Sequence, residues 1–289
     1  MKVLVTGANG QLGTDLCRVL PKTDIAPLTH ADLEITDINS VKAAFANSQP
    51  DVIINTAAYV RVDDCETEQD KAFRINAIGA RNVAVAAQEL GAKLVHISTD
   101  YVFGGEPEQR TIPYTEFDAP IPISTYGKSK LAGEDFVRHL CRRHFIVRSS
   151  GLFGVAGSSG KGGNFVETML RLAKERNELK VVNDQVFSPA YTKDLAAKIA
   201  QLISTECYGI FHITNSGACS WYEFTREILK LAELKTPVVP ITSEEFPQKA
   251  KRPNYSVLDN YHLRLMGMDD MRPWQDALRD YMEEKGYTG

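Results

Sequence analysis

The sequence predicts an α/β fold, a doubly wound parallel sheet, together with a smaller C-terminal lobe. Through the first half of the chain, short β-branched runs alternate with longer amphipathic segments, which is the pattern of strand–helix–strand units. Beyond residue 216 this alternation is lost, and prolines stand at positions 237, 240, 247, 253 and 273. The first pattern indicates a parallel sheet with helices on both faces, and the second indicates a separate, less regular lobe.

The expected strands are near-continuous apolar runs, as in strands that are buried on both faces. They cover residues 2–6, 51–55, 94–98 and 143–149, with a weaker pattern at 24–28. Helical spacing of apolar residues covers 11–20, 38–47, 67–90, 165–176 and 192–203. Strand-like stretches at 185–188 and 209–214 are expected to return to the sheet.

A glycine-rich turn, VTGANGQLG, lies between the first expected strand and the first expected helix. Gly7, Gly10 and Gly13 allow a tight turn and let backbone N–H groups approach a pyrophosphate at the helix N-terminus. The spacing is G-x-x-G-x-x-G rather than G-x-G-x-x-G, and three glycines also occur in turns that bind nothing. The position directly after a strand favours a Rossmann-type dinucleotide site.

This interpretation divides the chain. Residues 1–150, with about 185–215 returning to the same sheet, are expected to form an NAD(P)-binding Rossmann domain. Residues 151–184 and 216–289 are expected to form a substrate-binding lobe, and the boundary falls at the glycine-rich loop that follows Gly151.

The residues after the second expected strand bear on cofactor choice. A carboxylate there would bind the ribose 2′-hydroxyl of NAD, but Thr-His-Ala follows at 29–31, and Asp32 and Glu34 come later. The sequence therefore predicts no strict selectivity for NADH, with NADPH slightly favoured. Asp37 is expected near the adenine or at the N-cap of the 38–47 helix, and the two roles are compatible.

Composition excludes several classes of partner. The 289 residues carry a net charge of −4, which gives no electrostatic case for binding nucleic acid or an anionic membrane. No apolar run is long enough to span a bilayer and the N-terminus lacks a signal-peptide pattern, so a cytoplasmic protein is expected. The five cysteines are scattered without a Cys-x-x-Cys pair, which predicts neither a disulfide framework nor a zinc site, and we assign no metal.

Tyr126 and Lys130 stand four residues apart in STYGKSKLAGE. On a helix this spacing places both side chains on one face, where an ammonium favours the ionised form of a phenol and lowers its pKa. The pair is either a tuned proton donor or an incidental pair on a solvated helix.

Four motifs decide between these readings: TGANGQLG, NTAAY at 55–59, STDYVF at 98–103 and YGKSK at 126–130. Together they resemble the extended short-chain dehydrogenase/reductase superfamily and, most closely, its dTDP-4-dehydrorhamnose reductase family. The resemblance runs nearly the full chain, since NDQVFSPAYTKDLA from residue 183 and RPNYSVLDN from residue 252 also fit it.

The resemblance implies a catalytic trio of Thr99, Tyr126 and Lys130. Tyr126 would donate a proton to a carbonyl oxygen while a hydride arrives from the nicotinamide, and such acid catalysis contributes about 10²- to 10⁴-fold. Lys130 would bind the nicotinamide ribose and lower the tyrosine pKa, and Thr99 would hydrogen-bond the reacting oxygen.

The resemblance also implies binding residues. Those for the cofactor are Gly7, Gly10, Gln11, Leu12, Gly13, Asp37, Ile38, Ala57, Ala58, Tyr59, Asn76, Tyr126 and Lys130. Those for the substrate are Asp100, Tyr101, Asn164, Gln185 and Arg252. The Arg252 guanidinium suits a pyrophosphate, although it could be a surface arginine beside two lysines, and Tyr101 could equally belong to the core.

The implied reaction is NAD(P)H-dependent reduction of the 4-keto group of a dTDP-4-keto-6-deoxyhexose, first of all dTDP-4-dehydro-L-rhamnose to dTDP-L-rhamnose. Related dehydratases have Asp-Glu after the threonine, whereas Asp100 and Tyr101 follow here, which argues against dehydration. A nucleotide-sugar 4-epimerase and a non-catalytic dinucleotide-binding regulatory subunit, like that of methionine adenosyltransferase, are the alternatives. The intact trio favours an enzyme.

One stretch departs from the family pattern. Members often read Arg-Thr-Ser-Trp or Arg-Thr-Ala-Trp after the last central strand, with the tryptophan against the sugar, but this chain has Gly151 in that place. Phe153 or a residue of the following loop is expected to compensate, and the identity of the hexose is left open. Some relatives dimerise through a cation held by glutamates; Asp15 and Asp194 fall near two such positions, so a homodimer is also left open.

Overall fold

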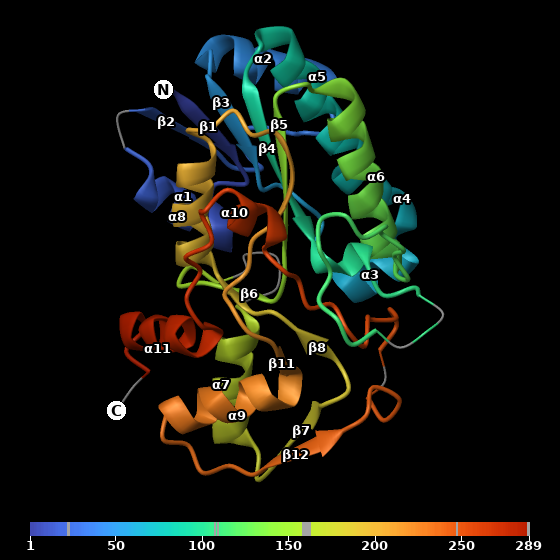
Figure 1. The fold of residues 1–289 in the computed structure, drawn as a ribbon, viewed down its shortest axis with the longest axis vertical. Coiled ribbons are helices and arrows are strands. Elements are labelled where there is room, and N and C mark those ends of the chain that lie inside the picture. Colours follow the sequence, from blue (N-terminus) through green and yellow to red (C-terminus); the bar gives the residue numbers. More distant parts are fainter. Residues whose placement is uncertain (22–23, 107, 109, 158–162, 247, 288–289) are drawn as a thin grey trace.

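A central six-stranded parallel sheet organises the chain, as predicted. The computed structural model describes residues 1–21, 24–106, 108, 110–157, 163–246 and 248–287. The strand order is β10-β5-β4-β3-β1-β2, and Figure 1 shows the sheet between two layers of helices. Its strands are β1 (Val3–Thr6), β2 (Ile25–Leu28), β3 (Val52–Asn55), β4 (Lys93–Thr99), β5 (His144–Ser149) and β10 (Gly209–His212).

The expected strand at 209–214 does return to the sheet, where β10 pairs with β5 in parallel and aligns Ile210 with Ile146. The stretch at 185–188 does not. It forms β8 (Val186–Phe187), which pairs antiparallel with β11 (Cys219–Ser220) outside the central sheet. A two-residue strand has too few ladder hydrogen bonds to be assigned to a sheet from its sequence alone.

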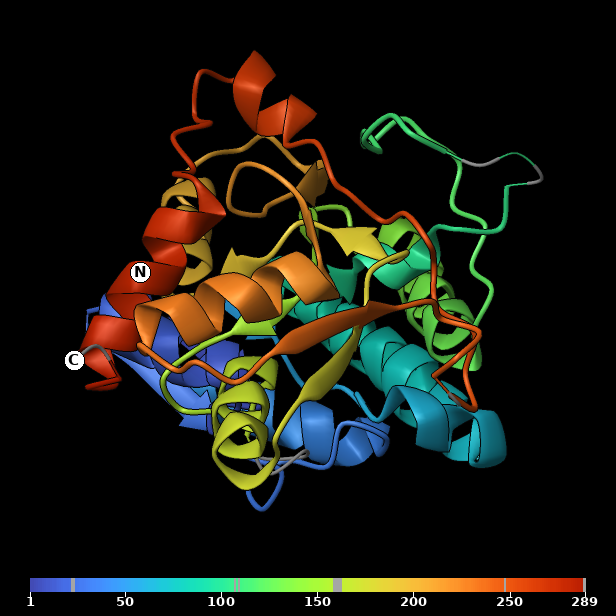
Figure 2. The same ribbon diagram turned by 90° about the horizontal axis from the view of Figure 1, so that it is seen from below.

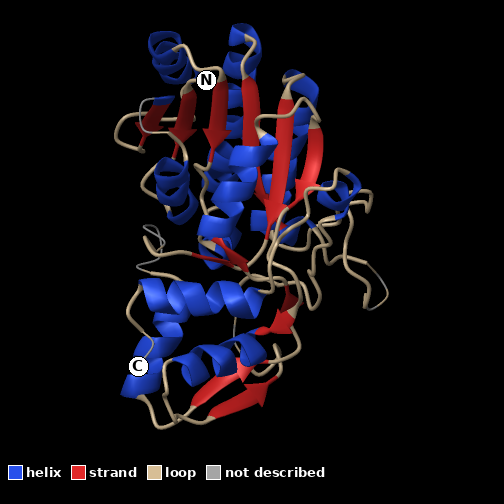
Figure 3. Cartoon of the chain, turned by 60° about the vertical axis from the view of Figure 1, so that its left-hand side comes forward, coloured by secondary structure: helices blue, strands red, loops and turns tan. Residues whose placement is uncertain are grey.

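Successive residues of the central strands face different cores, which explains their continuous apolar character. Val3 and Val5 pack with α1 (Gln11–Val19) and α8 (Thr192–Leu202) on one face of the sheet. Leu4 between them packs with α2 (Ile38–Ser48), α5 (Ala80–Leu90) and α6 (Thr125–Leu140) on the other. Figure 3 shows the helices on both faces of the sheet.

The segment 67–90, expected as one helix, is divided. It comprises α4 (Gln69–Phe73), a π-helical turn (Arg74–Gly79) and α5. A short helix that the sequence pattern did not predict, α3 (Val62–Thr67), precedes it. The π-turn places Asn76 inward, where its side chain bonds the backbone of Tyr59, and such turns often occur at functional sites.

The remaining elements gather at the end of the molecule seen from below in Figure 2. They are β6 (Leu152–Phe153), α7 (Phe165–Glu175), β7 (Leu179–Val182), β9 (Ala190–Tyr191), α9 (Trp221–Leu231), β12 (Val238–Ile241) and α11 (Trp274–Glu284). Helix α10 (Tyr261–Leu265) lies instead beside β10, where Leu263 packs in the first core of the sheet. Helices α7, α9 and α11 share a third apolar core that includes Val166, Ile228 and Leu278. No helix of the described residues is both long and apolar enough to cross a bilayer.

Candidate active site

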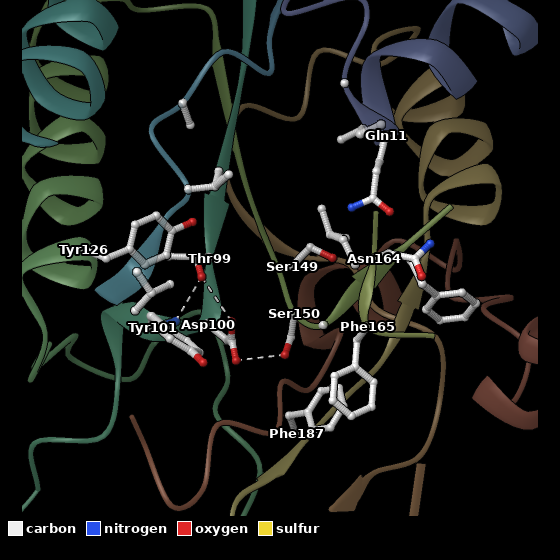
Figure 4. A pocket seen from close by; sticks show the side chains of 18 of the residues that line it. Gln11, Thr99, Asp100, Tyr101, Tyr126, Ser149, Ser150, Asn164, Phe165 and Phe187 are labelled. Carbon is white, nitrogen blue, oxygen red and sulfur yellow. Dashed lines mark hydrogen bonds between the residues drawn. The ribbon is translucent and has the colours of Figure 1, made fainter. Parts of the chain in front are cut away.

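A cavity of about 1000 Å³ runs from the glycine turn after β1 to an aromatic cluster beside α9. It lies along the carboxyl ends of β1, β3, β4 and β5, which is where doubly wound folds bind ligands. Figure 4 shows Gln11 entering it from one end, Thr99 and Tyr126 at its side, and Phe165 and Phe187 toward the other end.

The glycine turn is shaped by close backbone contacts. Gly7 has φ +67°, and a Cβ on Gly13 would lie 2.3 Å from the Gly7 carbonyl oxygen. Helix α1 begins at Gln11 without a side-chain cap from Gly10, so its first N–H groups are available to a ligand. The Gln11 Oε1 atom is buried without a hydrogen-bond partner. A cradle that side chains would fill, at a helix start whose N–H groups are available, fits the pyrophosphate of a dinucleotide cofactor, and the Gln11 Oε1 atom can accept from a hydroxyl or amide donor of the same ligand.

Most of the residues expected to bind the cofactor line this cavity. These are Gly7, Gly10, Gln11, Leu12, Gly13, Ala57, Ala58, Tyr59, Tyr126 and Lys130. Asp37, Ile38 and Asn76 are not in the lining. The Asp37 carboxylate caps α2 by accepting from the Asn39 N–H at 2.9 Å, and Asn76 lies behind the lining, where it holds the Tyr59 backbone.

The end of the cavity beside β2 is lined by residues that the sequence pattern did not single out as ligands: Thr29, His30, Leu33, Glu34 and Ile35. Asp32 is not among them. Its carboxylate accepts from the Thr29 N–H at 2.8 Å and from the Thr29 hydroxyl at 2.7 Å. This turn therefore directs Asp32 to the backbone rather than to a ribose.

The three expected catalytic residues line the same cavity. Thr99 ends β4, Tyr126 lies in the first turn of α6, and Lys130 follows one turn later. The Lys130 ammonium is 2% exposed and donates to the Ile97 carbonyl oxygen at 2.7 Å. The structure thus brings the trio together at the end of β4.

The first turn of α6 is held from two sides. The Ser124 hydroxyl caps the helix by accepting from the Gly127 N–H at 3.1 Å. Glu66 on α3 accepts from the N–H and from the hydroxyl of Thr125, each at 2.8 Å. These bonds fix the backbone directly before Tyr126, and a carboxylate at a helix N-terminus is also favoured by the helix dipole.

Burial, rather than Lys130, controls the pKa of Tyr126. Burial raises this pKa, the Thr99 hydroxyl lowers it, and the Asp100 charge raises it further. The expected depression by Lys130 is therefore wrong for this arrangement. Burial also lowers the pKa of Lys130 to about 8, against the opposing effect of Glu134. Tyr126 is consequently protonated at neutral pH, the state that a proton donor requires.

Asp100 connects three parts of the chain. Its carboxylate accepts from the Thr99 hydroxyl at 3.1 Å, from Ser150 at 2.8 Å and from Ser256 at 2.6 Å. Burial raises the pKa of Asp100 to about 6. The Thr99 hydroxyl has one proton and directs it to Asp100, while its oxygen accepts from the Tyr101 N–H at 3.2 Å. Asp100 lines the cavity, but these hydroxyls already occupy both of its oxygens, as the dashed lines in Figure 4 show in part.

Arg252 and Tyr101 lie together in the cavity wall. Tyr101 meets the Tyr126 ring edge to face at 5.9 Å, so it is a site residue rather than a core residue alone. The Arg252 guanidinium pairs with Asp63 on α3 at 2.9 Å and donates to Gln248 at 2.5 Å. With 17% of its side chain exposed, Arg252 is a held cation and not a freely solvated one.

Asn164 and Gln185 also line the cavity. The Asn164 side chain is already engaged: it accepts from the Glu167 N–H at 3.0 Å as the N-cap of α7 and donates to the Gly154 carbonyl and to Tyr281. Its side chain therefore shapes the cavity wall. Gln185 is 4% exposed and precedes β8.

Phe187 occupies the space beside Gly151. Gly151 has φ +52°, and a Cβ there would lie 2.2 Å from the Phe187 ring. Phe187 stacks on Trp221 with ring centroids 3.9 Å apart, and Phe165 follows at 4.5 Å from Trp221. We call Phe165, Phe187 and Trp221 the aromatic wall. Phe153 also lines the cavity, so its expected contribution stays a prediction, and residues 158–162 of the following loop lie outside the described residues.

The two aspartates near the family's cation positions are bound to their own chain. Asp15 accepts from Thr192 at 2.5 Å, and Asp194 pairs with Arg272 at 2.8 Å and accepts from Asn215. Across the described ranges, no group of three or more His, Cys, Asp or Glu side chains is arranged to hold a metal ion.

A dinucleotide turn and a Tyr/Lys pair that share one cavity define the class of short-chain dehydrogenases/reductases. The family model described as RmlD substrate binding domain matches residues 1–286. The chain belongs to this family, that of the dTDP-4-dehydrorhamnose reductases.

Individual relatives agree over the whole chain. The spore coat polysaccharide biosynthesis protein SpsK of Bacillus subtilis is 46% identical, with 98% of each chain covered. The dTDP-4-dehydrorhamnose reductase of Aggregatibacter actinomycetemcomitans is 37% identical, with 96% of this chain and 97% of the relative covered. The solved structure of dTDP-4-dehydrorhamnose reductase from Bacillus anthracis in complex with NADP is 48% identical, covers 98% of this chain and 100% of its own, and gives a TM-score of 0.91.

Proposed function

We propose that this chain catalyses NAD(P)H-dependent reduction of the 4-keto group of a dTDP-4-keto-6-deoxyhexose, converting dTDP-4-dehydro-L-rhamnose to dTDP-L-rhamnose. The observation that carries the proposal is the position of Tyr126 in a cavity that joins the glycine turn to the aromatic wall. Relatives named dTDP-4-dehydrorhamnose reductase, including one solved with NADP, support it.

The residues present fit a nicotinamide dinucleotide, which supplies the hydride when bound. The N–H groups of the glycine turn and of the start of α1 would hold its pyrophosphate, and the unpaired Gln11 Oε1 atom would accept from a hydroxyl or amide donor of the cofactor. Lys130 and Tyr126 lie at the end of the cavity wall formed by β4, where the nicotinamide ribose would be bound.

In the proposed reaction Tyr126 donates its phenolic proton to the C4 carbonyl oxygen as the hydride reaches C4, which gives the alcohol. The raised pKa keeps Tyr126 protonated before this step. The Thr99 hydroxyl lies between the Asp100 carboxylate and the Tyr126 phenol, so it would orient the phenol and hydrogen-bond the reacting oxygen while Tyr126 donates the proton. Lys130 orients the ribose and compensates the charge that develops on Tyr126.

The aromatic wall and Arg252 support a nucleotide sugar at the other end of the cavity, since a planar base packs on rings and a pyrophosphate pairs with a guanidinium. Within this proposal, residues 1–150 with the part of about 185–215 that returns to the sheet hold the cofactor, and 151–184 with 216–289, joined by Gln185 and Phe187, hold the substrate. We further propose that the enzyme is cytoplasmic and forms a homodimer. Light scattering on the purified protein measures its mass in solution and so tests the homodimer.

The deciding experiment is incubation of the purified protein with dTDP-4-dehydro-L-rhamnose and NADPH, with nicotinamide absorbance and sugar mass followed together. Loss of absorbance with a gain of two hydrogens on the sugar is expected. An unreduced sugar inverted at C4, with NAD retained through purification, would replace the proposal with an epimerase. No change with any dTDP- or UDP-keto-sugar would favour the regulatory-subunit alternative.

We expect NADPH to bind at least as tightly as NADH. Asp32 is directed to Thr29 and lies outside the cavity lining, and the Glu34 carboxylate in the lining already accepts from the Thr36 N–H at 2.9 Å and lies 3.9 Å from His30, so neither carboxylate is dedicated to a ribose 2′-hydroxyl. Calorimetric titration with each cofactor measures the ratio. A tenfold tighter NADH, about 1.4 kcal/mol, would contradict this prediction. Asp32→Asn is the control and should leave the ratio unchanged.

We expect Arg252→Ala to raise KM for the sugar nucleotide by about tenfold or more, with a much smaller effect on KM for NADPH. A hydrogen-bonded charge contributes about 1.5–3 kcal/mol, and a pyrophosphate remote from the reacting carbon contributes to binding more than to kcat. Steady-state kinetics with each substrate varied measure both constants. Lys251→Ala removes the neighbouring exposed cation and should change neither. Equal rises in both KM values would exclude a substrate-specific role.

A further inference from the structure

One face of α6 carries three polar residues at successive turns: Tyr126, Lys130 and Glu134. Glu134 is 1% exposed and lies outside the cavity lining. The end of β4 contacts this face twice. The Lys130 ammonium donates to the Ile97 carbonyl at 2.7 Å, and the Ser98 hydroxyl donates to Glu134 Oε1 at 2.5 Å. Glu134 is therefore attached to the strand that ends in the catalytic threonine.

Arg148 on β5 fixes the same carboxylate. Its Nη2 atom lies 2.6 Å from Glu134 Oε2 and its Nε atom 3.0 Å from Oε1, with the two side chains 2% and 1% exposed. A buried ion pair often contributes no more stability than apolar side chains of similar volume, since desolvation offsets the attraction. The position of this pair directly behind the Tyr/Lys face points to a role in the site.

We propose that Glu134, fixed by Arg148 and Ser98, is a positioning residue for the reaction, and that its carboxylate keeps the buried Lys130 ammonium charged where it donates to the Ile97 carbonyl. The inference rests on the proposed function for the role of Lys130 in the cofactor site. Glu134 lies one helix turn from Lys130 and would act through its charge, without touching the substrate.

The charges around Lys130 are consistent with this role. The charged or titratable groups linked to Lys130 directly or through one neighbour are His96 on β4, Glu134 and Tyr126 on α6, Asp100 after β4, and Arg148 on β5. Burial and the charge of Lys130 hold the pKa of His96 well below its usual value, so His96 is neutral. Tyr126 is neutral as well, and Asp100 acts on Tyr126. For Lys130, burial lowers the pKa to about 8 and Glu134 is the group that opposes this shift.

The sign of the pH effect follows from these directions. Lys130 carries its charge below its folded pKa of about 8 and loses it as the pH rises through that value. Removing the Glu134 charge leaves desolvation unopposed and lowers the pKa further. Glu134→Gln should therefore move the alkaline limb of kcat/KM to lower pH by about one unit, a tenfold loss of activity at fixed pH above the limb.

The pH profile of kcat/KM and the Kd of NADPH over the same pH range test this inference. Asp135→Asn is the matched control, because it neutralises the next carboxylate of the same helix on the exposed side, where Asp135 pairs with Arg138 at 3.7 Å. The control should keep both profiles. Glu134→Asp, which retains the charge, should keep the alkaline limb near its original pH, whereas a merely structural role would make Asp and Gln equally harmful without moving the limb.

Glu134→Gln leaves the Arg148 guanidinium buried without its partner, which can destabilise the fold. The double variant Glu134→Gln/Arg148→Met removes both buried charges, and the same pH profiles are measured on it. Its alkaline limb should also lie below that of the wild type. A folded double variant with the limb at the wild-type pH would overturn the inference. If the wild type turns over no dTDP-keto-sugar, the proposed function fails, and the pH dependence of NADPH binding still decides the role of Glu134.

Discussion

Tyr126→Phe is expected to lower kcat by about 10²- to 10⁴-fold while the Kd of NADPH changes little. Phenylalanine keeps the ring that meets Tyr101 edge to face at 5.9 Å and removes only the transferable proton. The raised pKa of Tyr126 means that the phenol carries its proton at neutral pH, so the group that Phe removes is present in the wild type before the reaction. Single-turnover reduction and fluorescence titration with NADPH measure the two quantities separately.

The control for this variant is Tyr261→Phe. Tyr261 begins α10 and its ring meets Phe117 at 5.9 Å, away from the residues that line the cavity. Its hydroxyl should be dispensable for turnover. Activity of Tyr126→Phe within tenfold of the wild type would exclude Tyr126 as the proton donor, since acid catalysis contributes more than that.

Much of the fold was predictable because its signals are local. A strand buried on both faces is apolar at most positions, so runs such as VIIN in β3 stand out. Helix α3 gave no such signal, since VDDCET has six residues, three of them acidic, and no apolar period. Its contacts are tertiary: Asp63 pairs with Arg252, and Glu66 binds the start of α6. A helix of this length depends on such contacts more than on propensity.

The candidate site also combines residues that short sequence motifs predict with contacts that form only in the tertiary structure. The glycine turn and the Tyr126–Lys130 pair are short motifs, and the structure places them in one cavity. The bonds from Ser150 and Ser256 to Asp100 join residues 50 and 156 positions apart, which no local pattern specifies. The pKa of Tyr126 was expected in the wrong direction for a related reason. Helical spacing reveals a neighbouring charge but not the depth of burial, and here burial dominates.

Gly151 leaves space at the aromatic wall that the Phe187 ring occupies. We expect Gly151→Ala to lower the free energy of unfolding through two effects. A left-handed backbone costs a non-glycine residue about 1–2 kcal/mol, and forcing a methyl group into a filled space costs about 1–3 kcal/mol. The second term arises because the added Cβ would lie 2.2 Å from the Phe187 ring. Displacing that ring should also raise KM for the sugar nucleotide.

The two effects can be separated with a matched glycine. Gly91 has φ +66° and no neighbouring atom within 4 Å of its would-be Cβ, so Gly91→Ala measures the backbone term alone. Phe187→Leu shortens the side chain beside Gly151, and the double variant Gly151→Ala/Phe187→Leu should recover the difference between the Gly151 and Gly91 losses. Urea denaturation of the four variants gives the coupling energy, which should be about 1 kcal/mol or more for residues in contact. Equal losses at Gly151 and Gly91, or strictly additive effects in the double variant, would show that Phe187 does not fill the space that Gly151 leaves.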